Sequence, residues 1–228
     1  MGRAVSDHDG SYHRRVPPHT AAQGDGHRPA LRTERGLDRL VTFLDAVVAI
    51  AITLLVLPLV DVLGERGDDD LGTLLGHHLA QFGAFALSFA VIARLWLVHH
   101  RIVESVGAYD VLFLWVNLVW AFTIVVLPFA TQVMAEFGSD RLSVALYVGT
   151  ITTSSAAMTV LTVLLRRRAP LRREGVTAAD VQVTPAVITT GLLVIALVLG
   201  VAVQTISFYA LFLLFLTGPV ERLVRRRG

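Results

Sequence analysis

RLVTFLDAVVAIAITLLVLPLV, residues 39–60, is the stretch that decides the fold of this chain. From Ala46 to Val60 it carries no charge, and its only polar side chain is Thr53. At about 1.5 Å rise per residue, a helix over 40–63 extends about 36 Å, which exceeds the ~30 Å hydrocarbon core of a bilayer. The stretch therefore predicts a transmembrane helix.

Two charged residues stand at the start of this helix. Arg39 precedes it, and Asp45 lies one to two turns inside. An ionisable group in a membrane helix is costly unless it meets a partner or water. Either the two charges lie near the lipid headgroups, or they tie this helix to others. The small residues Ala46, Ala49 and Ala51 would allow a neighbouring helix to approach closely.

Composition supports an all-α integral membrane protein. The 228 residues are 54% hydrophobic and only 17% charged, whereas globular domains carry about 25% charged residues. The absence of cysteine excludes disulfides, thiolate metal sites and cysteine nucleophiles. A net charge of +2 does not argue for nucleic acid. No phosphate loop, HExxH motif or nucleophile–base pair is present, so we expect no enzyme, no cofactor and no metal beyond a permeating ion.

Six apolar spans follow one another along the chain. They cover about 40–63, 74–98, 110–134, 142–165, 184–203 and 205–223. Residues 1–34 are polar, rich in Gly, Pro, His and Arg, and have no apolar period, which predicts a disordered tail. The chain thus divides into a tail, 1–34, and a six-helix transmembrane domain, 35–228.

The loops predict the orientation of these spans. Loop 64–72 is acidic on balance, and loop 135–141 is short and mixed. Arginines concentrate on the other side, notably in RRRAPLRR at 166–173 and in the segment after residue 223. Because cytoplasmic loops hold the excess of Arg, both termini are expected in the cytoplasm.

Three polar residues inside or beside the spans are candidates for helix contacts. Adjacent helical residues point about 100° apart, so His99 and His100 cannot face one partner; we expect one to face protein and the other headgroups or water. Asn117 lies in mid-membrane, where a bare amide costs several kcal/mol without partners, so it should bind another span.

The fourth span has a hydroxyl face. Thr152, Ser155, Thr159 and Thr162 follow i, i+3, i+7 and i+10, which places them on one stripe of a helix. This stripe could line a wet path, but hydrogen bonding between helices is the commoner use of such residues.

Several motifs together resemble the transmembrane protein 175 family of endosomal and lysosomal potassium channels and their prokaryotic relatives. The family signature, Arg-x-x-x-Phe-Ser-Asp, is matched by Arg39, Phe43 and Asp45, with Leu44 in place of the Ser. Further matches are Ser88-Phe89, Trp96-x-x-His99-His100-Arg101, Asn117 and Pro128-Phe129-Ala130-Thr131. The resemblance covers about 35–135, and beyond 140 it rests on the number of spans.

The resemblance implies six helices per subunit, four identical subunits around one pore, and a first helix that lines the pore. It assigns the constriction to Ile50, Thr53, Leu54 and Leu57. It assigns the polar network that anchors the pore helix to Arg39, Phe43, Asp45, His99 and Asn117. The hydroxyl lost at Leu44 removes one member of that network.

These features predict a potassium-permeable channel, weakly selective for K⁺ over Na⁺, in a prokaryotic plasma membrane. No carbonyl filter or mid-membrane acidic ring is present, so selectivity would come from a narrow apolar neck that penalises the more strongly hydrated ion. Two other functions remain open. One is a proton channel or proton-coupled carrier that uses Asp45 and His99; the other is a non-conducting membrane scaffold.

Overall fold

The computed structural model describes residue 2 and residues 34–64, 70–138 and 140–202, and these ranges are almost entirely helical. The elements are α1 (Glu34–Leu54), α2 (Leu57–Gly64), α3 (Leu71–His77), α4 (Leu79–Glu104), α5 (Val111–Phe137), α6 (Arg141–Arg167), the 3-10 turn η1 (Ala169–Leu171) and α7 (Thr184–Ala202). Within the described ranges, five helical stretches are long and apolar enough to cross a membrane. The expected sixth span, 205–223, and the expected tail up to residue 33 lie outside the described residues.

The first predicted span is found as one membrane-length segment, Arg35–Val62, but its helix is interrupted. A turn at Leu55 and Val56 separates α1 from α2. Pro58 explains the break, because it has no N–H to bond the carbonyl of Leu54 and its ring would clash with that carbonyl. Proline is tolerated in the first turn of a helix, where α2 places it.

The second predicted span is also interrupted. Instead of one helix over 74–98, the short α3 ends at His77, and α4 begins at Leu79 and continues to Glu104.

Three helix starts are fixed by aspartates that the apolar pattern did not reveal. Asp70, Asp110 and Asp140 each accept a hydrogen bond from a backbone N–H in the first turn of α3, α5 and α6, respectively.

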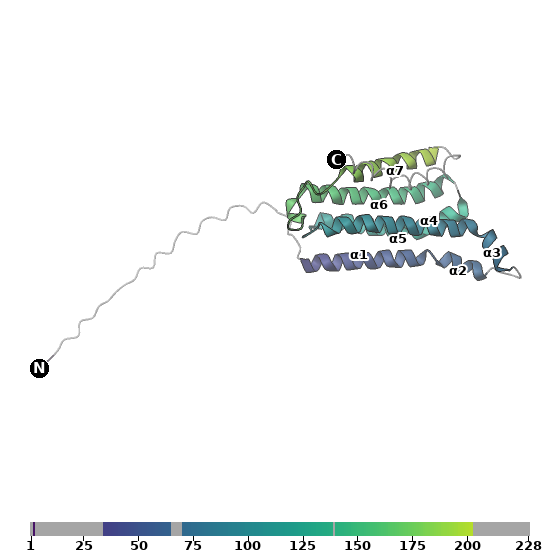
Figure 1. Cartoon of the computed structure of the whole chain (residues 1–228), viewed down its shortest axis with the longest axis horizontal. Coiled ribbons are helices and arrows are strands. Elements are labelled where there is room, and N and C mark those ends of the chain that lie inside the picture. The colour runs from purple at the N-terminus through teal and green to yellow at the C-terminus, as the bar shows by residue number, and fades with distance from the viewer. Residues whose placement is uncertain (1, 3–33, 65–69, 139, 203–228) are drawn as a thin grey trace.

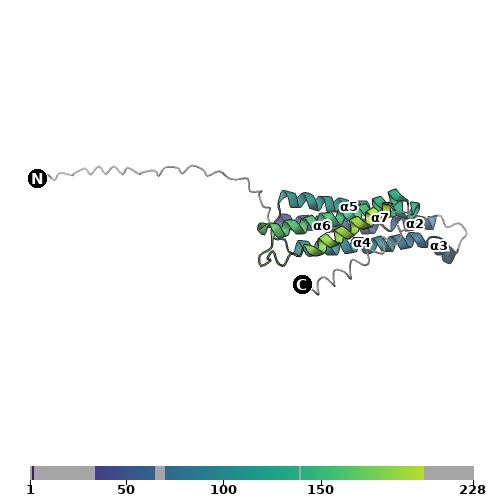
Figure 2. The same ribbon diagram turned by 90° about the horizontal axis from the view of Figure 1, so that it is seen from above.

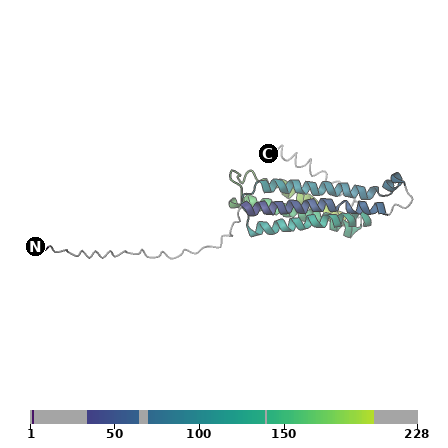
Figure 3. The same cartoon turned by 90° about the horizontal axis from the view of Figure 1, so that it is seen from below.

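The long helices lie nearly side by side and form a bundle (Figure 1). From α1 the layers pass through α4 and α5 to α6 and then to α7. Seen from above, α7 lies in front of α6 and crosses it obliquely (Figure 2). Seen from below, α1 lies in front of α4 and α5, and no other described helix covers it (Figure 3).

A node of three hydroxyl groups joins α4, α5 and α6 inside the bundle. Thr131 donates to Ser88 Oγ at 2.8 Å, and Ser88 Oγ lies 3.1 Å from the Tyr147 hydroxyl. All three residues are buried. Because lipid tails drive no apolar association between helices, packing and such buried hydrogen bonds hold a membrane bundle together.

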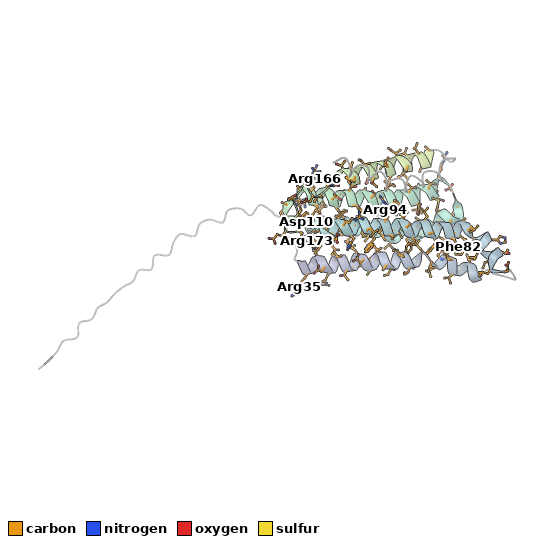
Figure 4. The ribbon with its side chains drawn as sticks, in the orientation of Figure 1. Arg35, Phe82, Arg94, Asp110, Arg166 and Arg173 are labelled. Carbon is orange, nitrogen blue, oxygen red and sulfur yellow. The ribbon has the colours of Figure 1, made fainter. Side chains whose placement is uncertain are left out.

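One end of the bundle holds Arg35, Asp110, Arg166 and Arg173 and is called here the arginine end (Figure 4). There the loop after α4 contacts the loop after α6. Arg168 forms an ion pair with the buried Asp110. The N–H of Arg173 donates to the carbonyl of Ser105 at 2.9 Å, and Gly107 packs against the backbone of that arginine.

Candidate functional site

Helix α1 has two distinct faces. Its buried face consists of Leu37, Leu40, Leu44, Val48 and Ala51, and Leu55 in the following turn is buried too. This face packs on α4 and α5. On the opposite side, Ile50 is 60% exposed and Leu54 is 41% exposed, while Leu57 at the start of α2 is 53% exposed. The residues expected to form a constriction thus share the uncovered side of the first membrane span.

Thr53 belongs to the same uncovered face and is exposed. Its hydroxyl donates to the carbonyl of Ile50, one turn earlier, at 2.8 Å. Because the proton is used within the helix, the oxygen presents its lone pairs outward. An outward hydroxyl of this kind acts as an acceptor, which suits a cation better than an anion.

Asp45 connects α1 to α4 through a residue that the sequence pattern did not pair with it. The indole Nε1 of Trp96 donates to Asp45 Oδ1 at 2.8 Å, in a partly buried position. A hydrogen bond to a charged acceptor is stronger than one between neutral groups. The carboxylate inside the first span is therefore a tie between helices. Within the described ranges, no group of three or more His, Asp or Glu side chains is placed to hold a metal ion.

His99 and Asn117 form a second tie, between α4 and α5. His99 Nε2 lies 2.8 Å from Asn117 Oδ1, and the amide nitrogen of Asn117 donates to the carbonyl of Phe113. The ring of His99 stacks on Trp120 with 3.8 Å between ring centroids and 6° between planes. Asn117 is completely buried and His99 is 3% exposed. The prediction that Asn117 bonds another span is confirmed.

His100 points elsewhere, as expected for the neighbour of a buried histidine. Its side chain is 45% exposed, lies 3.6 Å from Glu104 Oε1 and stacks on Trp96. In the part of the chain that the structure describes, no hydrogen bond joins Asp45 to His99. The two groups expected to form a proton relay belong to separate contacts.

The remaining members of the expected polar network lie outside these two ties. Arg39 is exposed, and it makes no hydrogen bond or ion pair with a described residue. Phe43 is 52% exposed. Leu44, which replaces the Ser of the family motif, is 1% exposed and lies in the hydrophobic core. At this position the chain substitutes apolar packing for a hydroxyl.

The hydroxyl face of α6 bonds to α7. Thr190 of α7 lies 2.8 Å from Ser155 Oγ and 2.9 Å from Thr159 Oγ1, and Thr159 also donates to the carbonyl of Ala186. Thr162 donates to a carbonyl of its own helix. Of the two interpretations of this stripe, hydrogen bonding between helices is confirmed for Ser155 and Thr159.

Sequence reasoning missed three partners. The sequence did contain a signal for Trp96, which stands four residues before His100 and therefore lies on the same side of α4 as that histidine. Tyr147 and Thr190 had none, because a single hydroxyl in an apolar span does not indicate which neighbouring helix it will face.

Comparison with known proteins finds similarity to one family over part of the chain. Residues 39–128 match the family model of the endosomal/lysosomal potassium channel TMEM175. A potassium channel of Streptomyces collinus is 34% identical over 106 residues, which cover 46% of this chain and 51% of that protein. A potassium channel of Chamaesiphon minutus is 34% identical over 117 residues, which cover 49% of this chain and 57% of that protein. The matches thus span about half the length of these relatives.

A solved structure shares the fold. It is the crystal structure of a lysosomal potassium-selective channel TMEM175 homolog from Chamaesiphon minutus, with a TM-score of 0.64 and 24% sequence identity. The match covers 82% of this chain and 98% of that one. The Arg39–Asp45 motif and the residues of the α4 and α5 ties lie within residues 39–128, the region of the family match. Over residues 39–128 the chain is similar to the TMEM175 family, and the bacterial proteins that it resembles are named potassium channels.

Proposed function

We propose that the protein is a potassium-permeable channel in which four copies of the chain place α1 and α2 around a central pore. The observation that carries this proposal is the pair of faces on the first span. One face is buried against α4 and α5, and the uncovered face presents Ile50, Thr53, Leu54 and Leu57. The naming of the bacterial relatives as potassium channels supports the choice of ion.

The uncovered face suggests how ions are selected. From Ile50 to Leu57 the neck would be about 10 Å long. An apolar neck forces ions to lose part of their hydration, and this costs more for Na⁺ than for K⁺ because Na⁺ is hydrated more strongly. The outward oxygen of Thr53 would offset part of the cost. Weak preference for K⁺ and closure by dewetting both follow from such a neck.

The proposed subunit has six membrane helices, with residues 205–223 as the sixth and both termini in the cytoplasm. The arginine end of the bundle would face the cytoplasm, because cytoplasmic loops carry the excess of Arg. Asp45–Trp96 and His99–Asn117 would act as anchors that hold α1 at the axis, and no ion would touch them.

The chain has no cysteine, so single thiols can test the pore directly. Purified protein in liposomes is expected to pass K⁺ faster than Na⁺. In the variants Ile50→Cys and Leu54→Cys, a small water-soluble thiol reagent should block the flux. The matched control Val194→Cys, an exposed apolar residue of α7, should remain insensitive to the reagent.

Two outcomes would oppose the proposal. If labelling Ile50→Cys and Leu54→Cys leaves K⁺ flux unchanged, α1 does not line the ion path. If proton flux depends steeply on pH and is abolished by His99→Ala while K⁺ flux survives, the function is proton transport.

A further inference from the structure

The loop after α4, residues 105–110, is fixed along one side to the loop after α6. Val106 forms an antiparallel β-bridge with Arg172, and the N–H of Gly107 donates to the carbonyl of Leu171 at 2.9 Å. Val106 is completely buried and Leu171 is 1% exposed. The contact combines backbone hydrogen bonds with apolar packing, and it therefore fixes the backbone of the loop at this point.

The end of the same loop is fixed by one carboxylate with two partners. Asp110 Oδ1 accepts a hydrogen bond from the N–H of Phe113 at 2.8 Å and thereby starts α5. The other oxygen of Asp110 forms the ion pair with Arg168, which follows α6. Tyr109 thus stands between two fixed points, the bridge at Val106 and the carboxylate of Asp110.

Tyr109 extends from this loop to the first turn of α1. It is 5% exposed and belongs to the same hydrophobic core as Leu37. A Cβ at Gly36 would lie 2.8 Å from the phenol oxygen of Tyr109 and 3.4 Å from its ring carbon Cε1. Glycine weakens a helix, but here it allows the close approach of the ring. Arg35, the neighbour of Gly36, lies at the arginine end together with Asp110 (Figure 4).

Helix α1 is therefore held at two levels. Asp45, which accepts the hydrogen bond from Trp96, lies about 14 Å beyond Gly36 along the helix axis. Ile50 lies about 7.5 Å beyond Asp45. If α1 pivots at Asp45, a displacement of about 1 Å at Gly36 moves Ile50 by about half as much in the opposite direction. The contact at Tyr109 thus controls the position of Ile50 without touching it.

We propose that Tyr109 is a positioning residue for the constriction, and that it acts by holding the inner end of α1 through Gly36. The inference rests on the proposed function, in which Ile50 and Leu54 line the ion path. In a narrow apolar neck, a displacement of a fraction of an ångström changes how much water an ion must lose. The loop after α4 therefore influences the preference for K⁺ over Na⁺, although Gly36 lies about 21 Å from Ile50.

A pair of substitutions at the contact tests this role in the full-length protein. Gly36→Ala adds a methyl group against the phenol oxygen. It should change the K⁺/Na⁺ flux ratio in liposomes and the rate at which a thiol reagent blocks Ile50→Cys, because α1 is displaced at its inner end.

Tyr109→Phe should reverse both changes. It removes the oxygen that the methyl group meets, and the ring carbon at 3.4 Å is an ordinary contact for that group. Tyr109→Phe alone keeps the ring on α1 and should stay near wild type. The double variant Gly36→Ala with Tyr109→Phe should therefore return to the flux ratio and the block rate of Tyr109→Phe.

Two further variants complete the experiment. Gly83→Ala in α4 is the matched control, because a Cβ there meets nothing within 4 Å, and it should leave the flux ratio and the block rate at wild-type values. Tyr109→Leu adds no atom to the contact but withdraws the ring from Gly36, so it should shift the same two quantities. Tyr109→Leu decides the matter if Gly36→Ala does not fold.

Wild-type flux ratio and block rate in both Gly36→Ala and Tyr109→Leu would overturn the proposal. A change in Gly36→Ala that Tyr109→Phe does not reverse would also overturn it, because the methyl group would then act elsewhere. If the reagent fails to block Ile50→Cys in the otherwise unchanged chain, α1 does not line the ion path, and the channel proposal fails as well. Block at Ile50→Cys without any effect at Gly36 or Tyr109 would overturn only the role of Tyr109.

Discussion

Trp96 Nε1 donates a hydrogen bond of 2.8 Å to Asp45 Oδ1 and thereby fixes α1 to α4. The same indole ring stacks on His100, which reaches Glu104 at the exposed end of α4. The first membrane span is therefore held by a carboxylate whose partner is an indole, not by a salt bridge. This contact leaves the opposite face of α1, with Ile50 and Leu54, uncovered by its own chain.

Replacement of Trp96 by Phe should destabilise the protein. The ring surface is largely kept, but Asp45 loses a donor in a partly buried position, which costs about 1–3 kcal/mol. We expect a lower midpoint of thermal unfolding in detergent and altered K⁺ flux, because α1 is no longer fixed. Trp115→Phe is the control, since Trp115 is 61% exposed on α5. Equal effects of the two substitutions would show that the Asp45 contact contributes little.

Asn117 and His99 should depend on each other. Asn117→Leu leaves the buried His99 Nε2 without its partner, so it should cost about 1–3 kcal/mol. The double variant His99→Phe with Asn117→Leu removes both polar groups while keeping a ring on Trp120. Its loss of stability should be smaller than the sum of the single losses. Strict additivity in this double-mutant cycle would indicate that the two side chains act independently.

Much of this architecture could be predicted from the sequence because lipid imposes simple rules. A membrane helix must be long and apolar, so the third, fourth and fifth spans were placed within three residues of α5, α6 and α7. The prediction that Asn117 bonds another span followed from the cost of burying an amide that has no hydrogen-bond partner. Resemblance to a family supplied Asp45 and His99 as anchors.

Other features could not be predicted, because they depend on three-dimensional neighbours. Hydropathy does not show where a helix is interrupted, so the sequence did not predict the turn before Pro58 or the break at His78. The partner of Asp45 is 51 residues away, and that of Ser155 is 35 residues away. The period of apolar residues along a helix does not indicate which distant residues will form such hydrogen bonds.

The loop contact at the arginine end should tolerate no side chain at Gly107. A Cβ there would lie 2.8 Å from Arg173 Cα and 3.1 Å from the carbonyl oxygen of Arg172. Because these are backbone atoms, Gly107→Ala must displace one loop and should cost about 1–3 kcal/mol, as overpacking does. In contrast, a Cβ at Gly76 meets nothing within 4 Å, and Gly76→Ala should leave the thermal midpoint unchanged or raised. A Gly107→Ala variant as stable as Gly76→Ala would mean that the two loops do not touch.

The uncovered face of α1 leads to a prediction about leak. Ile50→Asn should increase ion flux through the open and closed channel and weaken the preference for K⁺, because an amide at the neck favours water and opposes dewetting. The fold should survive, since Ile50 is 60% exposed and packs little within its own chain. Val194→Asn makes the same chemical change on α7, where the residue is 45% exposed, and should leave K⁺ and Na⁺ flux at wild-type levels. Flux measured in liposomes under matched K⁺ and Na⁺ gradients distinguishes the two. An Ile50→Asn channel with unaltered leak and selectivity would place the constriction elsewhere.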